Sequence, residues 1–297
     1  LTTPTLTTTN RAYALEILGT TTTITNATNF LNTGALTLGD AVGDTLNFTG
    51  GLTATAANVV NMAGAFNTTN SAIVLGSGTT PVQLTANVTM GTGTGNVTFG
   101  GLLNGNQELV VNSAGVTAFN ALVGSVTPLA RITTDALGSI QINTASVATT
   151  GTQTYNDIVS LLVGSTLTGS TVTFNDAVIG TADLSVVGAA VLNAGSINTT
   201  GAQSYSATTT LMRDTVLTAG AVSFVGPLDS ASNSAYALSV NSSGATTFGG
   251  AVGGTHALRS VTTNAGGTLV MNGGAVTTTG AQSYGEAITL GHDTTLT

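Results

Sequence analysis

Asn112-Ser-Ala-Gly-Val-Thr-Ala-Phe119 recurs further along the chain as Asn241-Ser-Ser-Gly-Ala-Thr-Thr-Phe248. The similarity continues at the same offset, without a gap, as far as Tyr155 in the first copy and Tyr284 in the second. Similarity at a fixed offset is the signature of a repeat architecture, in which each unit is too small to bury its own apolar side and must stack on its neighbours. The repeat therefore predicts a stack of similar units.

A shorter unit lies within the long one and consists of an aromatic residue followed, four positions later, by an aliphatic residue. Phe119 and Val123 form one such pair, and Phe248 and Val252 form another. From the middle of the chain onward the aromatic members of this series are Phe99, Phe119, Tyr155, Phe174, Phe224, Phe248 and Tyr284. Most of the gaps between them are close to one or two multiples of about 19 residues, a length that suits one coil of a β-helix and is too short for a propeller blade or a helical repeat.

Short runs of alternating aliphatic and polar residues occur between the aromatics, as in Ile140-Gln-Ile142, Leu184-Ser-Val186 and Leu238-Ser-Val240. A period of two indicates strands with one buried face, and the intervening Gly and Asn clusters supply tight corners. We predict an all-β fold, a right-handed parallel β-helix (β-solenoid) of about 12–15 coils with roughly 19–24 residues each. The crossover rule for parallel strands favours the right hand.

No segment differs in composition from its neighbours, so the sequence predicts a single continuous solenoid over residues 1–297. Within it we expect a less regular start at 1–33, looser repeats at 34–103 and clear higher-order repeats at 104–297.

Charge is scarce and acidic, because four Arg and no Lys face twelve Asp and Glu, giving a net charge of −8. This composition excludes nucleic acid as a partner, since phosphate neutralisation needs clustered basic residues. No apolar run approaches the length of a membrane helix, so we expect no membrane span. The absence of Cys excludes disulfides and thiolate metal sites. The first residues lack the features of a signal peptide, so we expect such a signal to be removed or to lie outside this sequence.

The acidic residues offer two weak candidates for a Ca²⁺ site. Asp40 and Asp44 lie in a segment similar to half of a glycine–aspartate calcium repeat, but the full pattern does not recur. Asp157 and Asp176 follow equivalent aromatic residues, so they could stack on adjacent coils, although solvated turn positions are the favoured interpretation.

Other candidate residues have ordinary structural interpretations. His256 and His292 each lack a second ligand at metal-binding spacing, so we expect them to be surface residues. The aromatics could line a sugar groove, but their fixed phase relative to Val and Leu favours stacks in the core. We accordingly assign no catalytic, cofactor-binding or metal residue, and we expect the protein not to be an enzyme.

Residues 278–297, Thr-Thr-Gly-Ala-Gln-Ser-Tyr-Gly-Glu-Ala-Ile-Thr-Leu-Gly-His-Asp-Thr-Thr-Leu-Thr, resemble repeats of large filamentous-haemagglutinin-like bacterial exoproteins, and residues 241–255 resemble them too. The resemblance extends from about Asn104 to the C-terminus and, more loosely, over 34–101. It implies a right-handed parallel β-helix, a location outside the cell or on the bacterial surface, and a role in adhesion, aggregation or biofilm. Nothing in the sequence is similar to the family's N-terminal secretion domain.

These observations together predict a non-catalytic structural or adhesive segment of a secreted or surface-displayed bacterial fibre. Its expected partners are a receptor on a host or neighbouring cell, or other copies of the chain through end-to-end or lateral self-association. The alternative is a subunit of a self-assembling extracellular filament or sheath. A third hypothesis is a β-helix enzyme that degrades polysaccharides. It is disfavoured because such catalysis needs paired carboxylates, and nearly all the Asp and Glu residues here have no second acid nearby in the sequence.

Overall fold

The computed structural model describes all 297 residues and contains strands but no helix. Contacts divide the chain into two compact units, Leu1–Asp157 (unit 1) and Ile158–Thr297 (unit 2). Each unit is a β-solenoid of parallel stacked strands, with about 14 coils in the two units together. The all-β solenoid and the expected number of coils are therefore confirmed.

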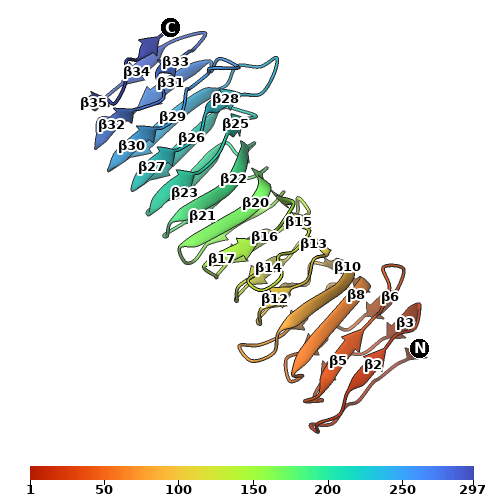
Figure 1. Ribbon diagram of the computed structural model, residues 1–297. Helices are drawn as coiled ribbons and strands as arrows, with labels where there is room; N and C mark the ends of the chain where they lie inside the picture. Colours follow the sequence, from red (N-terminus) through yellow and green to blue (C-terminus); the bar gives the residue numbers. More distant parts are fainter. The chain divides into compact units, whose positions relative to one another are not determined.

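Each coil of unit 1 contributes strand segments to three ladders, and in each ladder parallel pairing joins equivalent segments of successive coils (Figure 1). The β5 ladder contains β2 (Leu15–Ile17), β5 (Ala35–Leu38), the first halves of β8 (Val59–Asn67) and β10 (Val82–Gly93), β12 (Leu103–Asn104), Val123 and β17 (Ser146–Ala148). The β6 ladder contains β1 (Thr2–Thr3), β3 (Thr21–Ile24), β6 (Thr45–Phe48), the second halves of β8 and β10, β13 (Glu108–Ser113), β15 (Arg131–Thr134) and β18 (Thr152–Tyr155). The β7 ladder contains β4 (Thr28–Phe30), β7 (Leu52–Ala54), β9 (Ile73–Leu75), β11 (Val97–Phe99), β14 (Val116–Phe119) and β16 (Ser139–Ile142).

Unit 2 also has three ladders. The β23 ladder contains β19 (Ile158–Leu161), β21 (Val178–Gly180), β23 (Ser196–Thr199), β26 (Thr215–Ala219), β29 (Ala237–Ser242), β31 (Ser260–Thr263) and β34 (Gln282–Tyr284). The β24 ladder contains the first halves of β20 (Ser165–Phe174) and β22 (Leu184–Leu192), β24 (Ala202–Tyr205), β27 (Ala221–Phe224), β30 (Ala245–Phe248), β32 (Thr268–Met271) and β35 (Ala287–Leu290). The β25 ladder contains the second halves of β20 and β22, β25 (Thr209–Leu211), β28 (Leu228–Ser230), Val252, β33 (Ala275–Val276) and β36 (Thr295–Leu296).

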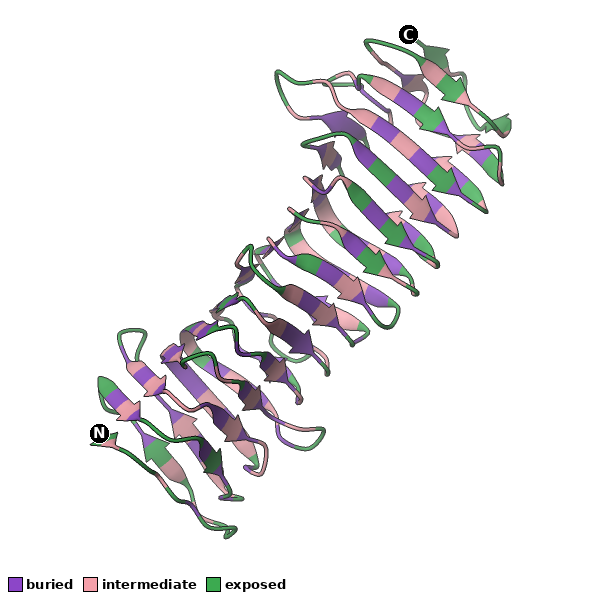
Figure 2. Cartoon of the chain, turned by 180° about the vertical axis from the view of Figure 1, so that it is seen from behind, coloured by how far each residue is buried: buried purple, intermediate pink, exposed green.

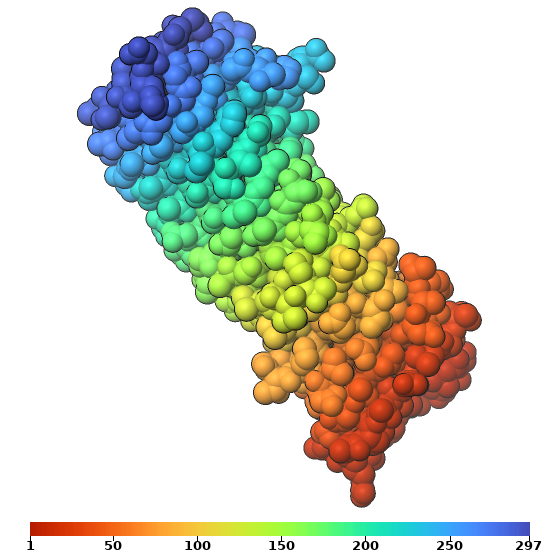
Figure 3. All heavy atoms as spheres, viewed as in Figure 1, coloured from red at the N-terminus to blue at the C-terminus, as the bar shows by residue number.

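The length of a coil is the sequence separation of paired residues. Thr45 pairs with Thr21 at a separation of 24, and Leu184 pairs with Ser165 at a separation of 19. Thr171 and Ala189, beyond a register shift in β20, are separated by only 18. The predicted range of coil lengths therefore holds for the ladders apart from this irregular segment. In Figure 3 consecutive segments form consecutive bands of colour within each unit, as stacked coils require.

Alternation along the strands produces the core. Figure 2 shows buried residues alternating with more exposed ones along many strands, and β5 and β6 each follow a strict alternation that ends on a buried residue. All eight Phe side chains are at most 1% exposed, and Tyr155 and Tyr205 are fully buried. The prediction that the aromatics lie in the core is therefore confirmed for these ten residues. It is wrong for Tyr13, Tyr236 and Tyr284, which are only partly buried.

The aromatic stacks follow the ladders. In unit 1 the rings of Phe99 and Phe119 lie 5.4 Å apart between centroids at an angle of 10°. In unit 2 Tyr205 lies 5.1 Å from Phe224, and Phe224 lies 6.0 Å from Phe248. Parallel pairing in register places identical positions over one another at about 4.8 Å, so a constant phase in the sequence becomes a column of rings.

Candidate functional site

The candidate Ca²⁺ site at Asp40 and Asp44 is a turn in which the carboxylate of Asp44 is bound by backbone N–H groups. Oδ2 of Asp44 accepts hydrogen bonds from the backbone N–H of Asp40 at 2.8 Å and of Ala41 at 3.0 Å. These bonds hold the pKa of Asp44 below its usual value, whereas the side-chain hydrogen bond with Asp44 raises the pKa of Asp40. Asp44 is buried and Asp40 is exposed, so the first stabilises the turn and the second faces solvent.

Asp157 and Asp176 differ in their surroundings. Asp157 follows β18 in unit 1 and is only 2% exposed, so the interpretation as a solvated turn position is wrong for this residue. Asp176 follows β20 in unit 2, is exposed and accepts a hydrogen bond from the N–H of Ala177 at 2.7 Å. The sequence suggests that Asp157 and Asp176 are equivalent because each follows an aromatic residue. That position in the sequence does not determine whether the carboxylate is buried. No group of three or more His, Asp or Glu side chains in the structure could hold a metal ion.

Both histidines are exposed, as predicted. His256 lies in a loop whose backbone is held by Asp229, since Oδ1 of this carboxylate accepts hydrogen bonds from the N–H groups of Thr255 and His256 at 2.9 and 3.1 Å. His292 lies between β35 and β36. Neither imidazole is part of a cluster of titratable groups.

A network of side-chain hydrogen bonds explains the Thr-Gly-x-Gln-x-Tyr segments that recur at Thr150–Tyr155, Thr200–Tyr205 and Thr279–Tyr284. The hydroxyl of Tyr205 donates to Oε1 of Gln203, and Nε2 of Gln203 donates to Oγ1 of Thr199 at 3.2 Å and to two backbone carbonyls. Oγ1 of Thr199 in turn donates to the carbonyl of Gly201 at 3.1 Å. The same bonds recur around Gln153 and Gln282. The motif is therefore structural, and it satisfies polar groups inside the coil.

A shallow groove of about 520 Å³ runs over unit 2 beside the ends of β23, β26 and β29. Its lining has no ionisable side chain. The amide and hydroxyl groups in the lining come from residues that include Asn198, Thr218, Asn241, Ser243 and Asn264. Such a lining can donate and accept hydrogen bonds. It has no group that could act as a general acid or base.

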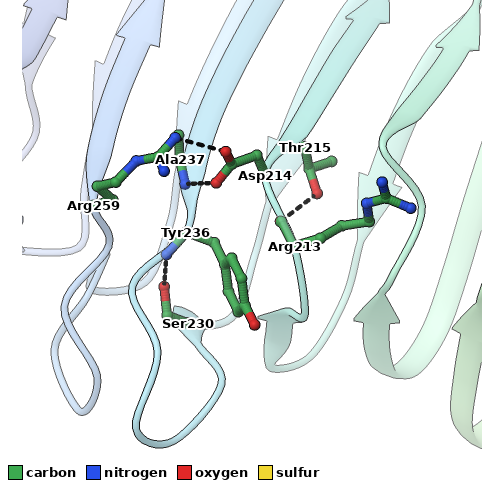
Figure 4. Close-up of polar contacts among 7 residues, drawn as sticks. All are labelled: Arg213, Asp214, Thr215, Ser230, Tyr236, Ala237 and Arg259. Atoms are coloured by element: carbon green, nitrogen blue, oxygen red, sulfur yellow. Dashed lines mark hydrogen bonds and ion pairs between the residues drawn. The ribbon is translucent and has the colours of Figure 1, made fainter.

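Two ion pairs join arginines to acids of earlier coils, one coil back for Arg131 and two coils back for Arg259. Nη2 of Arg131 lies 2.8 Å from Oε1 of Glu108 in unit 1, and Nη2 of Arg259 lies 2.6 Å from Oδ2 of Asp214 in unit 2 (Figure 4). Oδ1 of Asp214 also accepts a hydrogen bond from the N–H of Ala237 at 2.9 Å. Because of this backbone bond and the nearby guanidinium, the pKa of Asp214 lies below its usual value. Neither ion pair is evident from the sequence, because both depend on the register between coils.

No helix of the structure has the length and apolar character needed to cross a membrane. Comparisons with family models, curated proteins and solved structures find no match to this chain.

Proposed function

We propose that this chain is a non-catalytic structural segment of a secreted or surface-displayed bacterial fibre, acting as the stalk of an adhesin. The observation that carries this proposal is the ladder architecture of each unit, in which nearly every strand serves a regular core. Parallel strands paired on both sides resist extension along the stack, since backbone hydrogen bonds connect each coil to the next. Length and stiffness are the properties that a stalk requires.

The chemistry of the surface supports a passive role. The acids in contact with other groups accept hydrogen bonds from backbone N–H groups or pair with arginine, as Asp44, Asp229 and Asp214 do. The groove beside β23, β26 and β29 has no ionisable side chain in its lining. Together with the resemblance to filamentous-haemagglutinin-like repeats, these features favour adhesion, aggregation or biofilm formation at the cell surface as the setting.

Electron microscopy of the purified chain tests the stalk proposal. Separate particles of uniform length are expected, and antibodies against the chain should label intact producing cells. Release of reducing ends from an acidic polysaccharide by the purified chain would overturn the non-catalytic role.

The alternative is a subunit of a self-assembling extracellular filament or sheath. Polymers with a continuous axial repeat of about 4.8 Å in fibre diffraction would favour this alternative over the stalk.

A further inference from the structure

One corner of unit 2 aligns two arginines and a tyrosine on three consecutive coils. Thr215 on β26 pairs with Leu238 on β29, and Leu238 pairs in turn with Val261 on β31. Two positions before these paired residues are Arg213, Tyr236 and Arg259, which we call the corner column. The backbone N–H of Arg259 donates to the carbonyl of Tyr236 at 2.9 Å, as this stacking requires.

The acid beside the corner column is already satisfied. Oδ2 of Asp214 pairs with Arg259, and Oδ1 accepts the N–H of Ala237, so both oxygens are engaged. Arg213 is exposed and forms no ion pair. Figure 4 shows Arg259 and Asp214 directed toward each other and Arg213 extended the opposite way. Arg213 therefore stays unpaired even though acids outnumber arginines by twelve to four in this chain.

The guanidinium of Arg213 lies beside Gly195 of the preceding coil. A Cβ atom added at Gly195 would lie 3.7 Å from Cζ and Nε of Arg213, which is ordinary van der Waals contact. Gly195 has no side chain that could compete for the donors of the guanidinium, so these donors stay available to a ligand.

Tyr236 is one of three tyrosines, with Tyr13 and Tyr284, that do not belong to the fully buried aromatic core. It is only partly buried, and its hydroxyl makes no hydrogen bond. The residue ends a loop after β28, and this loop lengthens its coil, because ladder partners are further apart in sequence after the loop than before it. Its N–H donates to Oγ of Ser230 at 3.0 Å, so the main chain that carries the ring is fixed on both sides (Figure 4).

We propose that the corner column binds an acidic polysaccharide that runs along the stack of coils, with a uronate carboxylate on Arg213 and a neighbouring sugar ring against Tyr236. Arginine binds carboxylate through two parallel hydrogen bonds, and a tyrosine ring offers an apolar face with a polar edge, which matches a pyranose. Adjacent coils separate the two groups by about 4.8 Å along the stack, so one extended chain can reach both.

The charge of the protein selects among anionic polymers. A net charge of −8 repels a polymer with several charges on each sugar more strongly than a polymer with a single carboxylate per sugar, and one free guanidinium suits the second kind. An acidic peptide supplies carboxylates too, but it lacks the stacked ring that would use Tyr236. A polysaccharide that contains uronate is therefore the ligand class that can contact both Arg213 and Tyr236.

Affinity electrophoresis of the full chain in gels that contain polygalacturonate tests the proposal. The acid form should retard the protein, and the fully methyl-esterified polymer should retard it at least about tenfold less, as expected when a charge-assisted hydrogen bond is lost. Arg213→Ala should weaken binding by a similar factor. The matched control is Arg131→Ala, because Arg131 lies in unit 1 and is paired with Glu108. This variant should bind polygalacturonate as strongly as the unchanged protein does.

Variants of the tyrosine separate the ring from its hydroxyl. Tyr236→Ala should weaken retardation, whereas Tyr236→Phe should retain most of it. Circular dichroism confirms that each variant is folded. The proposal is overturned by equal binding of acid and ester, by equal effects at Arg213 and Arg131, by no retardation at all, or by equal competition from polyglutamate. None of these results bears on the stalk proposal, which depends on particle shape and surface location.

Discussion

The hydroxyl of Tyr205 donates a hydrogen bond at 3.2 Å to Oε1 of Gln203, two residues earlier on the same strand, and both side chains point into the coil. The arrangement gives a phenol hydroxyl a partner in an otherwise apolar stack. Nε2 of Gln203 extends the network to Thr199 and to the carbonyls of Ile197 and Thr218. A single glutamine thus satisfies groups from three strands.

Replacing Gln203 with Ala should therefore destabilise the protein. Tyr205 and Thr199 would lose a buried partner, and each unsatisfied buried polar group costs roughly 1–3 kcal/mol. Denaturant unfolding should show the loss, and Tyr205→Phe should lose only about 1 kcal/mol. Gln141→Ala is the control, because Gln141 is a strand glutamine outside the buried core and its change should stay within about 0.5 kcal/mol. An unchanged midpoint for Gln203→Ala would contradict the network.

The aromatic stack makes a second prediction. Phe224 lies between Tyr205 and Phe248, so Phe224→Ala should leave a cavity and cost about 3–5 kcal/mol. The adjacent Val225 is 57% exposed, and Val225→Ala should change the free energy of unfolding by less than about 0.5 kcal/mol. Thermal and denaturant unfolding of the two variants measure the contrast. Similar losses at 224 and 225 would contradict the inward orientation of Phe224.

The glycine of β22 that lies opposite the bulge of β20 cannot be replaced. Gly188 has a φ of +118°, and an added Cβ would collide with the carbonyl oxygen of Gly169 on the preceding coil. Gly188→Ala should therefore reduce the yield of folded protein or lower the unfolding midpoint, since it combines backbone strain with a steric clash. Gly164→Ala is the matched control, because the nearest atom to its Cβ would be 3.8 Å away. Equal stability of the two variants would contradict the backbone at Gly188.

Ionisation of the tyrosines should oppose folding at alkaline pH. Burial raises the pKa of Tyr284 to about 12 and also raises the pKa of Tyr155 and Tyr205. The folded state thus favours the neutral phenol, whose unfolded pKa is about 10. This stabilisation is complete below pH 10 and decreases as the pH rises toward 12. Phenolate absorbance followed together with circular dichroism measures the effect. Ionisation of all five tyrosines near pH 10 in a folded chain would contradict it.

The sequence was sufficient to predict the elements of this fold that repeat. Alternation in Leu184-Ser-Val186 and the phase of Phe119 relative to Val123 report directly on burial, because side chains on a strand alternate between its two faces. A fixed spacing was also enough to estimate the length of a coil.

Features that depend on register between coils could not be predicted in the same way. Coils differ in length, so the sequence alone does not reveal that Arg213, Tyr236 and Arg259 share one position. The burial of Asp157 depends likewise on what surrounds its turn. Gln203 has a recognisable motif, but a polar residue between small ones is read as exposed unless its partners are known.

The loop that ends at Tyr236 shows how such a chain can change. It adds residues to one coil while the flanking strands keep their partners. Strand pairing in the ladders therefore does not depend on the number of residues in a coil. An insertion can therefore lengthen a loop at one corner of a coil without altering the distance between paired strands. A scaffold with this property separates two evolutionary tasks, because recognition can diversify at the corners while reach is adjusted only by adding or deleting whole coils.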